Sequence, residues 1–206
     1  MMIKVCGMRD ADNIREAEKL GIDLMGLIFW PLSSRYVREC PTYLPTKVRR
    51  VGVFVDADIE AVRHTAREYA LDYVQLHGHE SPEYCARLVD SGLPFAIIKA
   101  FHISTTHDLL QTQAYDGIAD LFLFDTKGRL AGGNGEQFDW DILAAYQGDT
   151  PFLLSGGIGV DDIEKVKNFH HQRLAGIDLN SRFETTPGLK DINKLRTFLQ
   201  QLNNNE

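Results

Sequence analysis

The sequence lacks a close pair of cysteines: Cys6, Cys40 and Cys85 lie far apart, and no two have CxxC spacing. An odd number of scattered cysteines gives neither a disulfide framework nor a zinc-ligand pattern, so we expect no metal site. The chain also lacks an apolar run near the length of about 18 residues that a membrane-spanning helix needs. Charged residues interrupt the N-terminal segment, which therefore has no signal-peptide core. These absences predict a cytoplasmic protein with no membrane partner.

An excess of positive charge is missing as well, because the formal net charge is −7. Nucleic-acid-binding proteins usually carry a basic face, so we expect no nucleic-acid partner. Net charge does not exclude small anionic ligands, since glycine-rich loops and single arginines bind phosphate locally. Apolar residues make up 44% of the chain, which is enough for a sizeable core. We therefore expect one globular domain over residues 1–206.

Short apolar runs, typical of buried parallel strands, alternate with amphipathic helical patterns along the chain. The expected strands are residues 2–6, 23–30, 50–56, 72–77, 95–101, 120–125, 151–155 and 174–180. The expected helices are residues 10–20, 58–70, 81–91, 105–115, 139–147, 160–170 and 191–202. Two prolines in residues 41–47 permit only a short or irregular helix there. Eight strands with this many crossovers predict an α/β fold, a single closed (β/α)8 TIM barrel.

Reactive and polar residues follow the expected strands at their carboxyl ends, where TIM-barrel enzymes place their chemistry. Glycine-rich stretches follow the last three strands, at residues 131–140, 155–159 and 180–188. Their uncovered backbone N–H groups are suited to an anion, and the loops after strands 7 and 8 of such barrels often hold a phosphate. The segment 181–184 fits the short extra helix of such a site. The expected substrate contacts in these stretches are Gly133, Gly156, Gly157, Asn180 and Ser181.

These residues belong to motifs through which the chain resembles the phosphoribosylanthranilate isomerases over nearly its whole length. The matching stretches are IKVCGMR (3–9), GLIFWPLSSRYV (26–37), VGVFVD (51–56), VQLHG (74–78), IKAF (98–101), FDT (124–126), GGNGEQFDW (132–140), LLSGGI (153–158) and GIDLNSRFE (176–184). The resemblance implies a cofactor-free barrel in tryptophan biosynthesis. Its reaction would be the Amadori rearrangement of N-(5-phosphoribosyl)anthranilate to 1-(2-carboxyphenylamino)-1-deoxyribulose 5-phosphate. The partner it implies is thus a small phosphorylated molecule.

An Amadori rearrangement needs an acid that opens the ribose ring and a base that removes the C2′ proton. Asp125 shares strand parity with the apolar residues 121 and 123, so we expect it to face the barrel interior as the general acid. We expect Cys6 to be the general base, with the positive charge of Lys4 one layer below it. Arg35 suits the anthranilate carboxylate, because its planar fork can bind both oxygens.

Two other functions stay open at this point. Lys99, near the end of the fifth expected strand, has apolar neighbours that would lower the pKa of an amine and suit a Schiff-base aldolase. The other alternative is an inactive protein that binds a phosphorylated ligand, although the Cys6 and Asp125 pair argues against it.

Several residues that resemble site residues receive a structural interpretation. His77 and His79 lack further spaced ligands, and we interpret them as loop residues. Cys40 and Cys85 are interpreted as apolar filler of the core. We expect a monomer or a weak homodimer.

Overall fold

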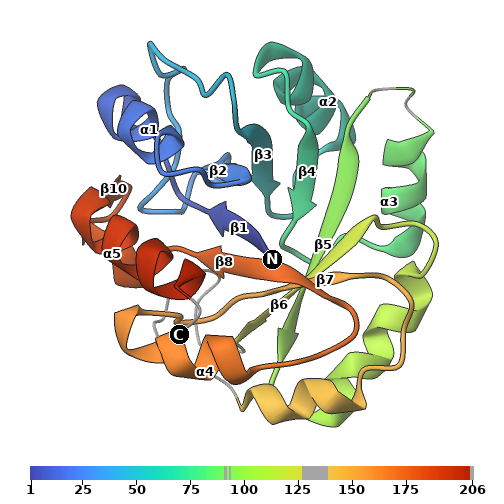
Figure 1. The fold of residues 1–206 in the computed structure, drawn as a ribbon. Helices are drawn as coiled ribbons and strands as arrows, with labels where there is room; N and C mark the ends of the chain where they lie inside the picture. The colour runs from blue at the N-terminus through green and yellow to red at the C-terminus, as the bar shows by residue number, and fades with distance from the viewer. Residues whose placement is uncertain (91, 93, 127–138, 205–206) are drawn as a thin grey trace.

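The computed structural model describes residues 1–90, 92, 94–126 and 139–204. Its main sheet is a closed barrel in which eight strands follow one another in chain order, each parallel to its neighbours. The strands are β1 Met2–Val5, β2 Leu24–Ile28, β3 Arg49–Phe54, β4 Tyr73–Leu76, β5 Ala96–Ile103, β6 Leu121–Thr126, β7 Phe152–Leu154 and β8 Leu174–Leu179. Figure 1 shows the helices around the outside of these strands. The predicted (β/α)8 barrel is confirmed.

Five α-helices lie in the described part of the chain. They are α1 Ala11–Glu18, α2 Ile59–Glu68, α3 Pro82–Val89, α4 Ile163–Asn168 and α5 Ile192–Asn203. Helix α3 begins as its sequence predicts, because the Ser81 hydroxyl accepts the Tyr84 N–H and a proline occupies the first helical position. None of the helices in the described ranges is long and apolar enough to cross a membrane.

Two of the expected helices are 3₁₀ helices, at Thr106–Tyr115 and Trp140–Ala145. Their buried pairs are three residues apart, Leu109 with Thr112 and Trp140 with Leu143. In a 3₁₀ helix, with three residues per turn, this spacing places both side chains of a pair on the same face. The expected helix 160–170 is also divided, into a 3₁₀ turn and α4, and residues 41–47 form no helix.

A small antiparallel hairpin follows β8 and was missed by the sequence analysis. Its strands, β9 Glu184–Thr186 and β10 Leu189–Lys190, are too short to produce an alternating pattern. The connecting Gly188 has φ +85°, a conformation that glycine adopts without strain. The hairpin brings two charged side chains, Glu184 and Lys190, to the carboxyl end of the barrel.

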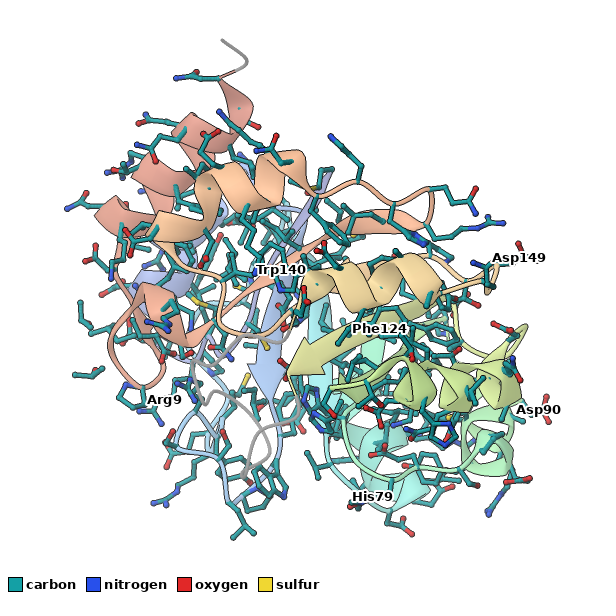
Figure 2. All side chains as sticks on the ribbon, turned by 90° about the horizontal axis from the view of Figure 1, so that it is seen from below. Arg9, His79, Asp90, Phe124, Trp140 and Asp149 are labelled. Atoms are coloured by element: carbon teal, nitrogen blue, oxygen red, sulfur yellow. The ribbon has the colours of Figure 1, made fainter. Side chains whose placement is uncertain are left out.

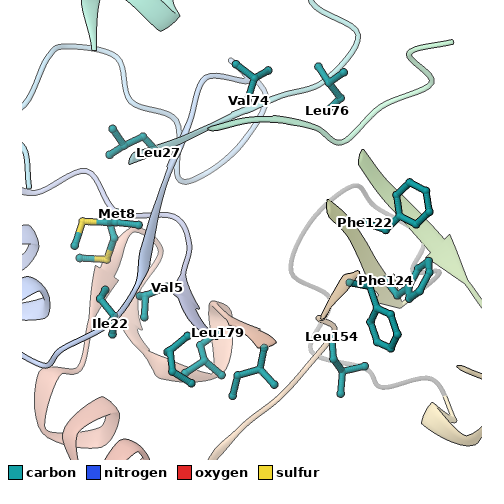
Figure 3. Close-up of a cluster of buried hydrophobic side chains, with 14 of the residues drawn as sticks. Val5, Met8, Ile22, Leu27, Val74, Leu76, Phe122, Phe124, Leu154 and Leu179 are labelled. Carbon is teal, nitrogen blue, oxygen red and sulfur yellow. The ribbon is translucent and has the colours of Figure 1, made fainter. Parts of the chain in front are cut away.

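The strands separate two apolar cores. The inner core, inside the barrel, contains Cys6, Leu24, Val51, Val53, Ile98, Ala100, Leu121, Leu123 and Leu153. The outer core lies between the strands and the helices, and Figure 3 shows part of it, with Val5 and Leu179 in one group and Phe122, Phe124 and Leu154 in another. Because side chains alternate along a strand, this division decides which polar groups reach a substrate inside the barrel.

Candidate active site

Cys6 lies directly after β1 and belongs to the inner core, where it is 4% exposed. Gly26 of β2 makes room for the thiol, because a Cβ at that position would lie 2.6 Å from Cys6 Sγ. Burial raises the pKa of the Cys6 thiol, and the positive charges of Lys4 and Lys190 oppose that rise without cancelling it. The structure therefore places Cys6 inside the barrel as a thiol with positive charge nearby.

Gly7 allows the chain to leave β1 without covering the site. Its φ of +77° lies in the left-handed region that glycine tolerates best. A Cβ at Gly7 would also lie 2.7 Å from Arg35 Cδ and 2.8 Å from Asn180 Oδ1. Two of the predicted substrate-binding residues thus pack directly over this glycine, beside Cys6.

Arg35 is held by Glu184 of the hairpin. Arg35 Nε donates to both carboxylate oxygens, at 2.9 and 3.0 Å, and Nη2 donates at 2.7 Å. Glu184 also accepts from Lys190 Nζ at 2.6 Å, and Lys190 Nζ donates to Asn180 Oδ1 at 2.8 Å. Burial alone would raise the pKa of Glu184, but the hydrogen bonds and charges of Arg35 and Lys190 outweigh it and lower that pKa.

This network leaves one edge of the guanidinium for a ligand. The hydrogen bonds of Arg35 among the described residues use Nε and Nη2, and none of them uses Nη1. A guanidinium offers two forks, so a second carboxylate can approach the Nη1 edge while Glu184 keeps the other. Glu184 and Lys190 are site residues that sequence reasoning missed, because no local pattern links them to Arg35.

Asp125 lies near the carboxyl end of β6, on the inner side with Leu121 and Leu123, as its parity predicts. Its Oδ2 lies 3.5 Å from His77 Nε2, and the two side chains are 15% and 11% exposed. His77 lies in the loop directly after β4, as interpreted, but its side chain is mostly buried and lies against Asp125 rather than in solvent. His77 continues the inner parity of Gln75, whose Nε2 lies 2.8 Å from His77 Nδ1. An amide N–H of Gln75 that donates to Nδ1 would place the proton of a neutral ring on Nε2, the nitrogen nearer Asp125.

His102 of β5 completes this group and was not identified from the sequence. It continues the inner parity of Ile98 and Ala100, and its ring lies 5.3 Å from the His77 ring, edge to face. The ligand atoms of His77, His102 and Asp125 all lie within 4.8 Å of one another. Two imidazoles and a carboxylate are a set that can hold a divalent metal. The same set suits proton transfer, since both residue types act as general acids and bases.

The loops after β7 and β8 lie side by side, as a phosphate site between them requires. A Cβ at Gly159 would lie 3.4 Å from Arg182 Cβ. Gly156 and Gly157 have φ of +96° and +68°, left-handed conformations that glycine adopts without strain. The expected short helix is a 3₁₀ turn, Ser181–Phe183. Gly133 lies outside the described residues, and the phosphate contacts stay a prediction.

The structure removes the aldolase alternative. Lys99 alternates with the inner residues Ile98 and Ala100, so it faces the outer side of the barrel. Its Nζ is 3.1 Å from Glu80 Oε2 and 2.8 Å from the Gly78 carbonyl oxygen. A Schiff-base lysine must reach the substrate, and Lys99 points away from the barrel interior.

The remaining sequence interpretations have mixed outcomes. His79 is an exposed loop residue, as expected: it lies at the edge of the molecule (Figure 2), and its side chain is 98% exposed. Cys85 is buried in the outer core, which confirms its interpretation as apolar filler. Cys40 is exposed, so the same interpretation was wrong for Cys40.

A closed parallel (β/α)8 barrel with a thiol, a carboxylate and two imidazoles at the inner carboxyl ends of its strands defines a TIM-barrel enzyme with acid–base chemistry. The family model described as N-(5'phosphoribosyl)anthranilate (PRA) isomerase matches residues 3–201. The chain belongs to this family of isomerases.

Individual relatives agree with this assignment. An N-(5'-phosphoribosyl)anthranilate isomerase of Parabacteroides distasonis is 51% identical over 208 residues, which cover 98% of this chain and 93% of that protein. The crystal structure of the phosphoribosyl anthranilate isomerase of Thermotoga maritima is 29% identical, with a TM-score of 0.84 and 98% of each chain covered. A second solved isomerase, 27% identical with a TM-score of 0.81 over 98% of each chain, is in complex with reduced 1-(o-carboxyphenylamino)-1-deoxyribulose 5-phosphate.

Proposed function

We propose that this chain converts N-(5-phosphoribosyl)anthranilate into 1-(2-carboxyphenylamino)-1-deoxyribulose 5-phosphate, with Asp125 as general acid and Cys6 as general base. The observation that carries the proposal is that Cys6 belongs to the inner core after β1, and that Asp125 on β6 has the inward parity of Leu121 and Leu123, with β7 and β8 between the two strands. The bound product analogue in a related isomerase supports the same substrate class for this chain.

Ring opening is the task assigned to Asp125. In its protonated form the carboxyl group delivers a proton to the ribose ring oxygen, and the C1′–oxygen bond breaks to give an open-chain iminium. We assign His77, whose Nε2 lies 3.5 Å from Asp125 Oδ2, the role of orienting this carboxyl group. Gln75 orients the imidazole through its contact with Nδ1.

Proton transfer from carbon is the task assigned to Cys6. Its thiolate takes the C2′ proton of the iminium, so that an S–H bond forms as the C–H bond breaks and an enolamine results. The Cys6 S–H returns its proton to C1′ while the enol O–H proton passes to the Asp125 carboxylate, which gives the ketone product and restores both the thiolate and the protonated carboxyl group. The Cys6 N–H donates to the Leu179 carbonyl oxygen at 2.9 Å, so the backbone that carries the sulfur is fixed to the neighbouring strand, as positioning of a base requires.

The two ends of the substrate need separate anchors. The Nη1 edge of Arg35 binds the anthranilate carboxylate while Glu184 holds the other edge. The phosphate is bound by the backbone around Gly156 and Gly157 and around Asn180 and Ser181, with Gly133 as a further contact. The steps consist of proton transfers and the opening of the C1′–oxygen bond, with no electrons taken from or given to another molecule, so the proposed reaction needs no cofactor. We further propose that residues 1–206 act as one domain, as a cytoplasmic monomer or weak homodimer.

The test combines a cellular and a purified assay. Expression of the chain should restore growth without tryptophan to a strain that lacks this isomerase. The purified protein should consume the anthranilate-type fluorescence of the substrate. Cys6→Ser and Asp125→Asn should each lose about 10²–10⁴-fold in kcat, whereas the exposed-cysteine control Cys40→Ser should keep wild-type activity. Tight substrate binding without turnover by the wild-type protein would instead support the inactive binding protein.

A further inference from the structure

A buried ion pair lies inside the barrel below Cys6. Lys4 Nζ donates to Asp178 Oδ1 at 2.8 Å, across the register that pairs β1 with β8, and the side chains are 0% and 6% exposed. The other carboxylate oxygen of Asp178 accepts from Ser155 Oγ at 3.2 Å. A buried ion pair adds little stability compared with well-packed apolar residues, so stability alone does not account for this one.

The pair is in direct electrostatic contact with the thiol. Lys4 and Cys6 occupy successive inward-facing positions of the same strand end, and the charge of the Lys4 ammonium, which is hydrogen-bonded to Asp178, counteracts the rise that burial causes in the pKa of the Cys6 thiol. The charged groups that face Cys6 are Lys4 from β1, Asp178 from β8 and Lys190 from β10. The neighbouring β2 contributes the uncharged Gly26. Lys4 is therefore ion-paired with Asp178 and also acts on Cys6 through its charge, and a Cys6 thiolate would be a second anion facing the same ammonium.

We propose that Lys4 and Asp178 are positioning residues that set the charge of Cys6, because the thiolate and the Asp178 carboxylate compete for one buried ammonium group. The inference rests on the proposed role of Cys6 as the base. When Cys6 loses its proton to solvent, the Lys4 ammonium shifts toward the sulfur, and Ser155 keeps its hydrogen bond to Asp178. When the thiolate takes the C2′ proton, the ammonium returns to Asp178. Neither residue needs to touch the substrate.

This competition predicts pKa changes of opposite sign. Lys4→Met removes the positive charge and leaves Asp178 facing the sulfur, so the pKa of Cys6 rises. Asp178→Asn frees the ammonium for the thiolate, so the pKa of Cys6 falls. A charge within about 4–6 Å shifts a pKa by about one to three units. Two residues with a purely structural role would weaken folding without this reversal of sign.

The experiment measures the Cys6 pKa directly in the full-length protein without substrate. Carbon-13 at the cysteine Cβ gives one NMR signal per cysteine, assigned with Cys40→Ser and Cys85→Ala, and each signal is followed as the pH is raised. The matched control is Lys99→Met, because Lys99 is also a buried, ion-paired lysine but faces the outer core, where its charge acts on Cys85. This control should raise the pKa of Cys85 and leave that of Cys6 unchanged.

The expected result is a rise in Lys4→Met and a fall in Asp178→Asn, with the pH profile of kcat/KM moving in the same directions. Ser155→Ala gives a milder third variant: Asp178 loses a donor, so the pKa of Cys6 should rise by a smaller amount, and this variant decides the question if Lys4→Met does not fold. Shifts of equal sign in Lys4→Met and Asp178→Asn, or no shift in Asp178→Asn, would overturn the proposal. Because the titration uses no substrate, its outcome is independent of whether Cys6 is the base.

Discussion

Gly26→Ala tests whether the position of the Cys6 sulfur limits catalysis. The added Cβ would lie 2.6 Å from Cys6 Sγ and 3.1 Å from Cys6 Cα, whereas ordinary contacts are 3.4–4 Å. Cys6 must therefore move by about 1 Å, and its own backbone blocks the simplest adjustment. A misplacement of about 1 Å in a reacting group costs on the order of 100-fold in rate. We expect Gly26→Ala to lower kcat by about that factor with little change in KM.

The matched control is Gly52→Ala, on the neighbouring β3. Its Cβ would overlap Leu71 Cδ1 and lie 2.9 Å from Phe54 Cε2, on the outer side of the barrel. Overpacking costs about 1–3 kcal/mol, so both variants should lose a similar amount of unfolding free energy in urea titrations. Only Gly26→Ala should lose activity in the fluorescence assay, measured well below the midpoint of thermal unfolding. Wild-type kcat in a folded Gly26→Ala protein, or equal losses in both variants, would refute the reasoning.

Three further predictions follow from other parts of the molecule. Arg35→Met should lower kcat/KM by roughly 10- to 150-fold, which corresponds to about 1.5–3 kcal/mol for a charged hydrogen-bonded pair. The loss should be smaller for an aniline analogue of the substrate that lacks the carboxylate. Equal losses for the two substrates would assign Arg35 another role. Hydrogen bonds from Ser104 and Thr105 outweigh burial and lower the pKa of Asp108, so its stabilising effect is present above about pH 4 and is lost as the pH falls through the lowered value. Asp108→Asn should thus cost about 1–3 kcal/mol of unfolding free energy at pH 7 and progressively less below pH 4, and a constant difference would contradict this. Prolonged dialysis against EDTA should leave kcat unchanged, because the proposed steps consist of proton transfers and the opening of the C1′–oxygen bond; activity lost with EDTA and restored by zinc would assign a metal to His77, His102 and Asp125.

The positions of the strands, and the side of the barrel to which their side chains point, could be predicted from the sequence because both depend on local patterns. A parallel strand buried on both faces is a short apolar run, and β7 Phe152–Leu154 falls inside the expected 151–155. Alternation then placed Asp125 on the inner side with Leu121 and Leu123, which are inner-core residues in the structure, and Asp125 lies against His77. The same rule, applied with a strand end set at 101, missed His102, because β5 continues to Ile103.

The partners of these residues could not be predicted, because they meet only when the barrel closes. Lys4 and Asp178 are 174 residues apart, and Arg35 and Glu184 are 149 apart. A single sequence reports periodicity along one segment, but it does not report which distant segments lie side by side. The hairpin that carries Glu184 is also too short for periodicity to identify it.

The isotope effect at C2′ tests the central assignment most directly. In this assignment Cys6 removes the C2′ proton and Asp125 protonates the ribose ring oxygen. Steady-state rates are measured for Cys6→Ser and Asp125→Asn with substrate that carries hydrogen or deuterium at C2′. Proton abstraction should limit Cys6→Ser, so deuterium should slow this variant measurably on top of a loss of at least about 100-fold in kcat. Asp125→Asn should stall at ring opening with a similar loss and little isotope effect. Near wild-type turnover by Cys6→Ser, or an isotope effect confined to Asp125→Asn, would contradict the account.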